Sequence, residues 1–552
     1  MAFVSAMNSP LTAGTKEGVK GSDVYTEEGV GDLRVALFTQ LVRGLDEGSI
    51  DTLVRKILPL GPDFVSDLIV MAFQTRDVRG GKGERDLFYS FIKAVLRKKR
   101  TWAYDLLKLV PEYGCWRDLW ELHLDFVGAV DQIVLEQFRL DQESEKPSLL
   151  AKWLPREGSK HSYSAVHFAR LLFPTKEPVD LNNKKQLAYQ LRQYRKTVAY
   201  LNKLIDTTEV KMCANQWATI NPQHVPGRLM HRNKLAFFNQ KKEHGEVVER
   251  YPDSEDRVDC ADKFKALLKD VKEGKVVMKG ANVVMPHELV HEIQQTFYQP
   301  GSQEEEETRQ AQWDAIRQKT LEAGGLGKVV PMCDFSGSMD GVPKEVSLAL
   351  GILISEVATS AFKDHILTFD SDPQWHSFTG KTTLREKVVS VGRLGQGLST
   401  DFQKACDLIL KRLVEHKVAP EDAPTDLLVL TDMGFDQASN SSYYNRKTSP
   451  WQTHFQMIRD AFQAQGYQTP RIVCWNLRAE YKDFHARAHE EGVVQLSGWS
   501  PSVLKAIQGE GIKVETPYGG MRRLLDDARY DPVREAVNRL IRSAGEDTVR
   551  SA

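Results

Sequence analysis

The spacing of apolar residues changes once along this chain, near residue 326, and this change limits the folds that the chain can adopt. Before it, apolar residues recur at intervals of three and four, as in the run 64–73, and this spacing predicts helices. After it, apolar runs such as 328–334, 426–432 and 471–477 alternate with helical segments. Such alternation predicts a parallel sheet with helices on both faces.

These patterns predict an α + α/β protein, in which an array of paired helices precedes a doubly wound sheet. A length of 552 residues is enough for several domains of about 100–200 residues each. No strand is expected before residue 326, and no repeat of fixed period is present. We expect a flexible N-terminal arm at 1–31, a helical domain at 32–325, an α/β domain at 326–515 and a C-terminal helical extension at 516–552.

Charge and cysteine content exclude several classes of protein. The formal net charge is −1, so the chain is not a polycation, and any charged binding surface must be local. Six cysteines lie far apart without a CxxC pair, which argues against zinc ribbons and redox motifs and favours a reducing compartment. Without a signal-like start or an 18-residue apolar run, no membrane span is expected, and we predict a cytoplasmic location.

Oxygen-bearing side chains gather where predicted strands end. Carboxyl ends of parallel strands meet at one edge of a sheet, so three loops can converge there. Carboxylates and hydroxyls together suit a hard cation, Mg²⁺ or another divalent ion. The candidate ligands are Asp334, Ser336, Ser338, Thr400 and Asp432. Ser399 could replace Thr400, Asp436 lies near Asp432, and the Ser/Gly stretch could instead be a turn that caps the next helix.

The stretch DFSGSM, which begins at Asp334, resembles the DxSxS motif of von Willebrand factor A domains. Asp334, Ser336 and Ser338 match the motif itself, while Thr400 and Asp432 match the second and third loops of the metal-ion-dependent adhesion site. This resemblance covers residues 326–515. It implies a Rossmann-like domain whose ion binds an acidic ligand from outside.

Two basic segments, 73–92 and 183–240, are candidates for binding nucleic acid. Within 181–240 there are 10 Lys or Arg residues against 2 Asp or Glu, interleaved with Tyr194, Tyr200, Trp217, Phe237 and Phe238. Cations for phosphates and aromatic rings for bases suit RNA. The alternatives are an ordinary interhelical turn at 73–92 and aromatic rings that belong to the core. The candidate RNA-binding residues are Arg76, Arg79, Lys82, Arg85, Lys184, Lys185, Arg192 and Arg195.

A helical half followed by this kind of α/β domain resembles the TROVE architecture of the Ro autoantigen. RDVRGGKGER, from Arg76, and the later stretch WATINPQHVPGRLMHRNKLAFF resemble an uncharacterised TROVE-like family even more. The resemblance implies HEAT-like helical repeats and the binding of small structured noncoding RNA.

We therefore expect a nonenzymatic RNA-binding protein that carries a metal ion. The alternative is an adaptor whose ion captures an acidic protein ligand. An enzyme is not expected, because no P-loop, second metal cluster or nucleophile–base pair is evident. His287 and His291 do not form an HExxH motif.

Overall fold

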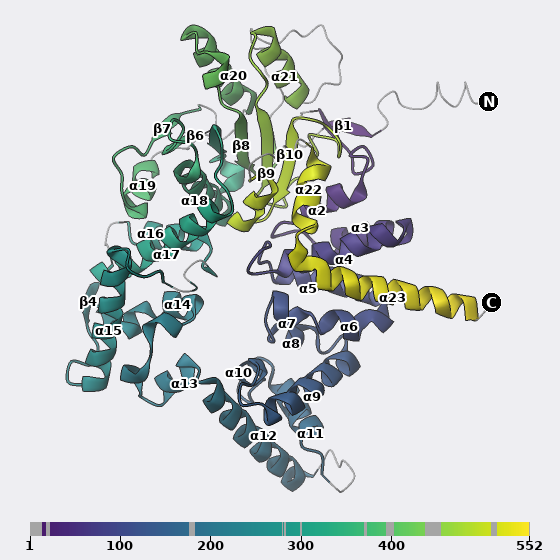
Figure 1. Ribbon diagram of the computed structural model, residues 1–552, viewed down its shortest axis with the longest axis vertical. Helices are drawn as coiled ribbons and strands as arrows, with labels where there is room; N and C mark the ends of the chain where they lie inside the picture. The colour runs from purple at the N-terminus through teal and green to yellow at the C-terminus, as the bar shows by residue number, and fades with distance from the viewer. Residues whose placement is uncertain are drawn as a thin grey trace.

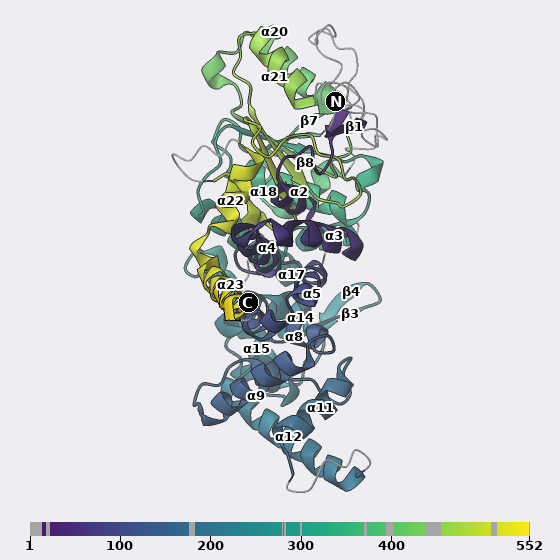
Figure 2. The ribbon, with the colours of Figure 1, turned by 90° about the vertical axis from the view of Figure 1, so that its right-hand side faces the viewer.

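The computed structural model shows an elongated molecule with a sheet near one end and the helix α12 (Lys184–Ile205) at the other (Figures 1 and 2). The protein is of mixed α/β type and mostly helical, as the apolar pattern predicted. The structure describes residues 14–17, 23–175, 183–278, 280, 283–297, 301–368, 373–392, 402–435, 454–508 and 516–550.

A six-stranded sheet forms the core of the C-terminal half. The strands lie in the order β10-β9-β8-β5-β6-β7, and all neighbours are parallel except the edge pair β6 and β7. The predicted strands 328–334, 426–432 and 471–477 are confirmed as β5, β8 and β9. Their bounds are β5 (Val329–Cys333), β6 (His365–Thr368), β7 (Trp375–Ser377), β8 (Asp426–Thr431), β9 (Arg471–Asn476) and β10 (Val493–Ser497).

Helices cover both faces of this sheet because successive side chains of a strand point to opposite faces. In β8, Leu427 and Val429 pack in one cluster with α20 (Phe402–Glu415) and α21 (His454–Ala464). Leu428 and Leu430 pack in the other cluster with α18 (Val342–Val357) and with the N-terminal helices. The sheet is therefore buried on both sides, which explains its continuous apolar strands.

The N-terminal half descends from the sheet to α12 and returns to it (Figure 1). The helix predicted from the run 64–73 is confirmed as part of α4, and the described residues before the sheet are mainly helical. The helices are α2 (Leu33–Gln40), α3 (Glu47–Ile57), α4 (Pro62–Arg76), α5 (Asp86–Lys98), α6 (Ala103–Leu107), α7 (Val110–Tyr113), α8 (Asp118–Leu122), α9 (Val127–Glu143), α10 (Leu150–Trp153), α11 (Ser162–Leu172), α12 (Lys184–Ile205), α13 (Thr208–Cys213), α14 (Gly227–Phe237), α15 (Glu255–Lys272), α16 (Pro286–Gln295) and α17 (Gln303–Glu322).

Both ends of this helical course pack against the α/β part. At the start, α2 contacts β10, and at the end α16 and α17 contact α18. Trp499 lies where the two ends meet: the guanidinium of Arg43 is 3.9 Å from its ring centroid, and the His287 ring centroid is 5.1 Å away. One apolar cluster runs from α2 to the sheet without a break, so the two halves share a core.

Two short hairpins correct the prediction that strands are absent before residue 326. The strands are β1 (Thr15–Glu17), β2 (Asp23–Tyr25), β3 (Gln240–Glu243) and β4 (Glu246–Glu249). Strands of three or four residues are too short to show a clear period. The prediction of a flexible arm is wrong for its second half: Val24 is fully buried, and Tyr25 N donates to Phe484 O at 2.7 Å.

The C-terminal extension contains two helices, α22 (Pro517–Leu525) and α23 (Asp531–Arg550). They return to the N-terminal half, where both contact α4 (Figure 1). A 3₁₀ helix at Pro501–Ala506 lies between β10 and these helices. In the ranges that the structure describes, no helix combines the length and apolar character needed to cross a bilayer.

Candidate functional site

Two acidic loops meet at the carboxyl edge of the sheet, because β5 and β8 are parallel neighbours. Asp334 directly follows β5, and Asp432 directly follows β8. From β5 the chain continues to β6 on one side, whereas from β8 it continues to β9 on the other. Ligands of open α/β sheets bind outside such a reversal of strand order. The two carboxylates therefore occupy the position at which this kind of sheet most often binds a ligand.

Hydrogen bonds fix the loop that follows β5. Asp334 Oδ1 accepts from Ser336 N at 3.0 Å, and Asp334 Oδ2 accepts from Thr431 Oγ1 at 2.9 Å. The hydroxyl oxygens of Ser336 and Ser338 lie 3.1 Å apart. Spacing by two residues thus places two hydroxyls beside one carboxylate, as the sequence predicted. Thr431, which precedes Asp432 in the run LVLTD, was not singled out.

Both carboxylates are buried, and no Lys, Arg or His forms an ion pair with either of them within the described residues. Burial, and then the negative charge of Asp432, raise the pKa of Asp334 to about 7. Asp432 Oδ1 accepts from Gly434 N at 3.0 Å, but the buried Oδ2 has no hydrogen-bond partner in that part of the chain. Buried carboxylates without a cation are costly, so this set of oxygen ligands fits a hard divalent ion.

The rim of this site comes from the segment after β9. Arg478 Nη1 donates to the carbonyl oxygen of Ser338, and the Tyr481 hydroxyl bonds the Ser338 side chain. An added Cβ at Gly434 would lie 2.4 Å from Tyr481 Cε2, so a larger residue there would displace the tyrosine ring. Gly337 is exposed and Ser338 is half-buried, so the site opens to solvent beside a cationic side chain. Arg478 and Tyr481 were not singled out from the sequence, although both closely follow the predicted strand 471–477.

The remaining predicted metal ligand is not placed by the structure. Thr400 lies outside the described residues, as do its alternative Ser399 and the nearby Asp436. The structure thus brings together Asp334, Ser336, Ser338 and Asp432.

Two of the predicted RNA-binding residues are structural, which corrects their assignment. Lys82 is fully buried, and its Nζ donates to Leu41 O at 2.8 Å, Phe38 O at 3.3 Å and Ser497 Oγ at 2.6 Å. Arg76 is also buried and pairs with Asp118 at 2.8 Å. Neither side chain can reach a phosphate, because each satisfies groups inside the protein.

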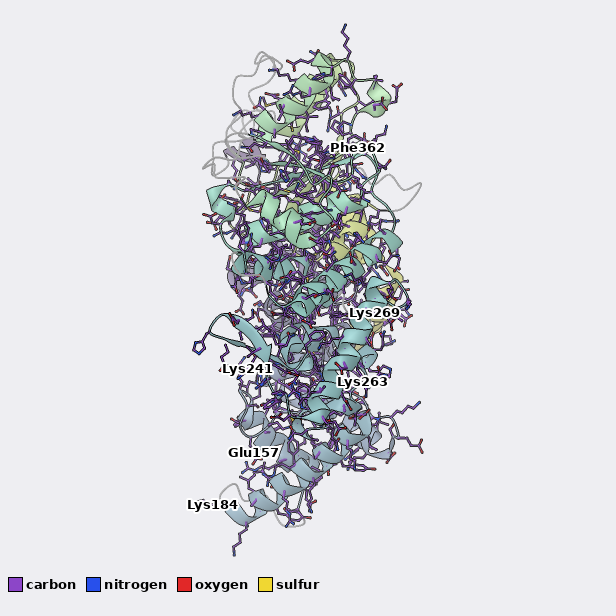
Figure 3. All side chains as sticks on the ribbon, turned by 90° about the vertical axis from the view of Figure 1, so that its left-hand side faces the viewer. Glu157, Lys184, Lys241, Lys263, Lys269 and Phe362 are labelled. Carbon is purple, nitrogen blue, oxygen red and sulfur yellow. The ribbon has the colours of Figure 1, made fainter. Side chains whose placement is uncertain are left out.

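The other six predicted RNA-binding residues are exposed. Arg79 pairs with Glu112 at 2.9 Å, and Arg85 lies 3.7 Å from the buried Asp118. The remaining four, Lys184, Lys185, Arg192 and Arg195, lie on α12. Figure 3 shows Lys184 reaching away from the end of the molecule opposite the sheet. The segment 73–92 joins α4 to α5, which lie apart from α12 in Figures 1 and 2. Its exposed cations and those of α12 therefore do not form one surface.

The aromatic residues of 183–240 divide into core and surface. Tyr194, Trp217, Phe237 and Phe238 are buried, so the alternative of core packing holds for them. Tyr200 is 60% exposed. Tyr189 was not singled out, although it is 54% exposed on the same helix. Its position four residues after Lys185 and three before Arg192 was the sequence signal.

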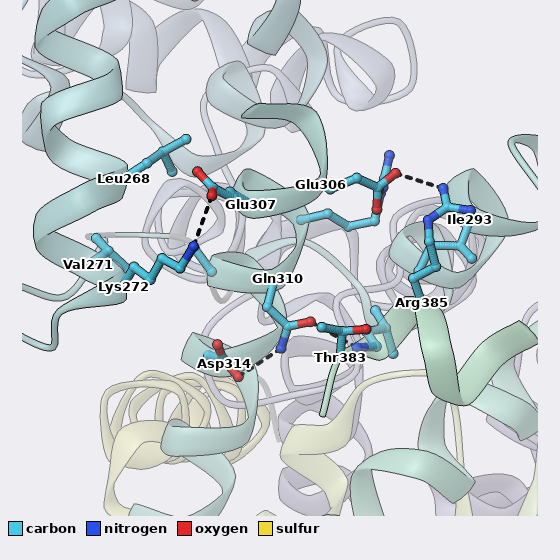
Figure 4. Close-up of a pocket in the computed structure, with 13 residues that line it drawn as sticks. Leu268, Val271, Lys272, Ile293, Glu306, Glu307, Gln310, Asp314, Thr383 and Arg385 are labelled. Atoms are coloured by element: carbon cyan, nitrogen blue, oxygen red, sulfur yellow. Dashed lines mark hydrogen bonds and ion pairs between the residues drawn. The ribbon is translucent and has the colours of Figure 1, made fainter. Parts of the chain in front are cut away.

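A cavity of about 440 Å³ lies between α15, α17 and α19 (Leu384–Val391) (Figure 4). Neither Asp334 nor Asp432 lines it. Its charged lining is paired internally: Lys272 with Glu307 at 3.2 Å, and Arg385 with Glu306 at 2.7 Å. These two ion pairs account for four of the charged side chains that line the cavity.

Comparisons with known proteins place this chain beside uncharacterised proteins. Residues 328–531 match the model of "Domain of unknown function (DUF7788)". Residues 127–251 match that of "Domain of unknown function (DUF2828)". "Uncharacterized protein L728" of Acanthamoeba polyphaga mimivirus is 27% identical over 462 residues, which are 79% of this chain and 75% of that protein. The first match begins at the strand before Asp334 and includes both buried carboxylates, so the candidate metal site lies within a region shared with that family.

Proposed function

We propose that this protein is a nonenzymatic RNA-binding protein with a TROVE-like helical domain and a von Willebrand factor A-like domain. Three features support the proposal. The strand order, counted from β5, is 3-2-1-4-5-6 with an antiparallel edge strand. The helical course returns to the α/β part at both ends. The oxygen ligands lie at the reversal of strand order.

One observation carries the RNA-binding role: the charge and exposure of α12. This helix contains six Lys or Arg residues and no Asp or Glu. Lys185, Tyr189, Arg192, Lys196 and Tyr200 are exposed at intervals of three and four residues, so they lie on one face. Cations along one face neutralise successive phosphates, and exposed tyrosines between them stack on unpaired bases.

A salt titration of RNA binding tests this role. The double variant Lys185→Glu/Arg192→Glu should weaken binding of a structured RNA and lower the slope of log K against log salt by about 1–2, because each lost phosphate contact contributes about 0.7–0.9. Lys265→Glu/Lys269→Glu on α15, where both residues are exposed, is the matched control and should bind normally. Equal losses in the two variants would refute α12 as the binding face.

The metal site supports a second candidate function, capture of an acidic protein partner. Asp334, Ser336, Ser338 and Asp432 would hold Mg²⁺ or a similar ion, with Thr400 as a further ligand. A bound ion would supply positive charge to the carboxylate of a partner. The observation that favours this role is the Oδ2 of Asp432, which has no hydrogen-bond partner among the described residues, together with Arg478 at the rim.

Partner capture is tested by isolating complexes with and without a chelator. Asp432→Ala should abolish retention of a partner that the wild-type protein holds in Mg²⁺. Asp340→Asn, at an exposed carboxylate nearby, is the control and should leave retention unchanged. A partner that stays bound after chelation would show that the ion is not the contact.

A further inference from the structure

Two histidines and an aspartate converge among α8, α9 and α11, three helices that lie away from the sheet in Figure 1. His123 directly follows α8, Asp131 lies in α9 and His167 lies in α11. His167 Nε2 is 2.8 Å from both carboxylate oxygens of Asp131, and His123 Nε2 is 3.1 Å from Asp131 Oδ1. All three ligand atoms lie within 4.8 Å of one another. Two separate elements thus direct ring nitrogens to a carboxylate on a third.

The surroundings hold this arrangement in place. The ring of His123 stacks on Phe168 with centroids 4.9 Å apart, and Trp120 packs edge-on against the same phenyl ring. His123 is 1% exposed, whereas the side chains of Asp131 and His167 are 19% and 29% exposed. One side of the cluster is therefore packed against aromatic rings, and the other opens to solvent.

Ser164 makes the cluster compatible with either tautomer of His123, with the proton on Nε2 or on Nδ1. Its hydroxyl lies 3.1 Å from His123 Nδ1. A serine hydroxyl can donate to a bare Nδ1 while Nε2–H bonds the carboxylate, or accept from Nδ1–H while Nε2 binds an ion. The second state is the usual support for a metal-bound imidazole, whose other nitrogen donates to a neighbour.

We propose that His123, Asp131 and His167 bind a transition-metal ion, with Zn²⁺ as the preferred one. Two imidazoles and one carboxylate suit Zn²⁺ and related ions, whereas Mg²⁺ and Ca²⁺ prefer sites built of oxygen alone. Ligand atoms of a tetrahedral zinc ion lie roughly 3.4 Å apart, given bond lengths of about 2.0–2.2 Å. The nitrogen–oxygen distances of 2.8–3.1 Å need to grow by only a few tenths of an ångström.

The ion would keep an open position towards solvent, because three protein ligands leave a tetrahedral shell incomplete. Water or a small anion can fill that position, since two neutral imidazoles and one carboxylate leave a divalent ion with net positive charge. The ion would also join α9 and α11, and α12 packs on α11. This site differs from the carboxylate site of the sheet in ligand type and preferred ion.

The test uses the full-length protein, stripped with a chelator and then titrated with ZnCl₂ in excess MgCl₂. The wild-type protein should bind Zn²⁺, and its zinc X-ray absorption spectrum should show two imidazole ligands. His123→Gln/His167→Gln should weaken this binding by at least about 100-fold, and Ser164→Ala by about 10-fold. His416→Gln, at an exposed histidine, is the control for loss of a histidine.

Two results would overturn the proposal. One is wild-type protein whose zinc affinity equals that of the double variant. The other is bound zinc whose spectrum lacks imidazole. Because the spectrum is recorded on wild-type protein, it decides the question even if the double variant fails to fold. Asp131→Asn provides a milder variant, which keeps a side-chain oxygen but should also lose most of the affinity.

Discussion

Lys82 Nζ donates a 2.6 Å hydrogen bond to Ser497 Oγ, although 415 residues separate the two along the chain. Lys82 follows α4, and Ser497 ends β10. The same ammonium bonds two carbonyl oxygens at the end of α2. A single buried side chain thus fastens the N-terminal helices to the last strand of the sheet.

Lys82→Met should therefore destabilise the protein by about 1–3 kcal/mol, because buried carbonyl oxygens lose their donor while the shape of the side chain is kept. The measurement is the midpoint of urea unfolding. Arg79→Met removes an exposed ion pair on the same loop, and its effect should stay below about 1 kcal/mol. Equal midpoints for Lys82→Met and the wild type would contradict this role of Lys82.

Mg²⁺ should raise the melting temperature of the wild-type protein, since an ion that binds only the folded state stabilises it. Asp432→Ala should remove this increase, because it deletes one of the two buried carboxylates of the proposed site. Asp340→Asn should keep it. Scanning fluorimetry in MgCl₂ and in chelator provides the comparison, and a full increase in Asp432→Ala would exclude this carboxylate as a ligand.

Acid should destabilise the packing around Trp499, where the two ends of the helical half meet, because it protonates His287. Burial is the main cause that lowers the pKa of His287 from 6.5 to about 4, although Glu288 raises it and Arg43, Arg228 and His291 lower it further. As the pH falls, His287 is therefore protonated in the unfolded chain at a higher pH than in the folded protein. Stability is therefore fully present above pH 6.5 and is lost as the pH falls towards 4, by about 3 kcal/mol in all.

Unfolding midpoints measured from pH 7 to pH 4 in wild-type protein and His287→Gln check this dependence. The variant should show a smaller fall with acid. His291→Gln, at an exposed position on the same helix, should fall as steeply as the wild type. Parallel curves for wild-type protein and His287→Gln would rule out His287 as the group responsible.

Arg529→Met should be strongly destabilising, because it leaves a buried carboxylate without its cation. Arg529 bonds both oxygens of Asp77 at 2.6 and 2.9 Å, and Asp77 is fully buried. The expected loss is about 3 kcal/mol. Part of it should return in Asp77→Asn/Arg529→Met, which removes both charges. Arg539→Met, exposed on α23, should change the unfolding midpoint little, and additive single effects would argue against the pair.

Tyr189→Ala and Tyr200→Ala should each weaken binding of single-stranded RNA by about 1–3 kcal/mol if each ring stacks on a base. The slope with salt should stay unchanged, since no phosphate contact is lost. Fluorescence anisotropy at several salt concentrations measures both quantities. Tyr163→Ala provides the control, because Tyr163 is exposed on the neighbouring helix α11. If the loss of affinity came with a lower slope of log K against log salt, the tyrosine variants would have lost phosphate contacts, which would argue against stacking.

The sheet and part of its site could be predicted because the necessary signals are local. Each strand is a short apolar run, and a parallel sheet brings the ends of such runs to one edge. Asp334 and Asp432 follow two of these runs directly, so adjacency along the chain became adjacency in space. The rim residues Arg478 and Tyr481 lie one and four residues after a third run, 471–477, and that signal was missed.

Burial of Lys82 and the histidine cluster could not be predicted in the same way. The sequence GGKGER has the composition of an exposed turn, and nothing near Lys82 indicates that the end of β10 covers it. His123, Asp131 and His167 come from three helical elements whose crossing depends on tertiary packing. Periodicity gives the buried face of each helix, but it does not give which faces meet.

The ion pairs that join α4 and its C-cap Asp77 to the C-terminal extension have a consequence for synthesis on the ribosome. Asp67 precedes its partner Arg522 by 455 residues, and Asp77 precedes Arg529 by 452. At about 5–20 residues per second, roughly 20–90 seconds pass between translation of the two partners. During this interval α4 carries carboxylates that the finished protein buries. Arg34 of α2 can already pair with Asp67 at 2.8 Å, but Asp77 gains its cation only after Arg529 emerges. The final packing at this end of α4 therefore waits for the C-terminal extension.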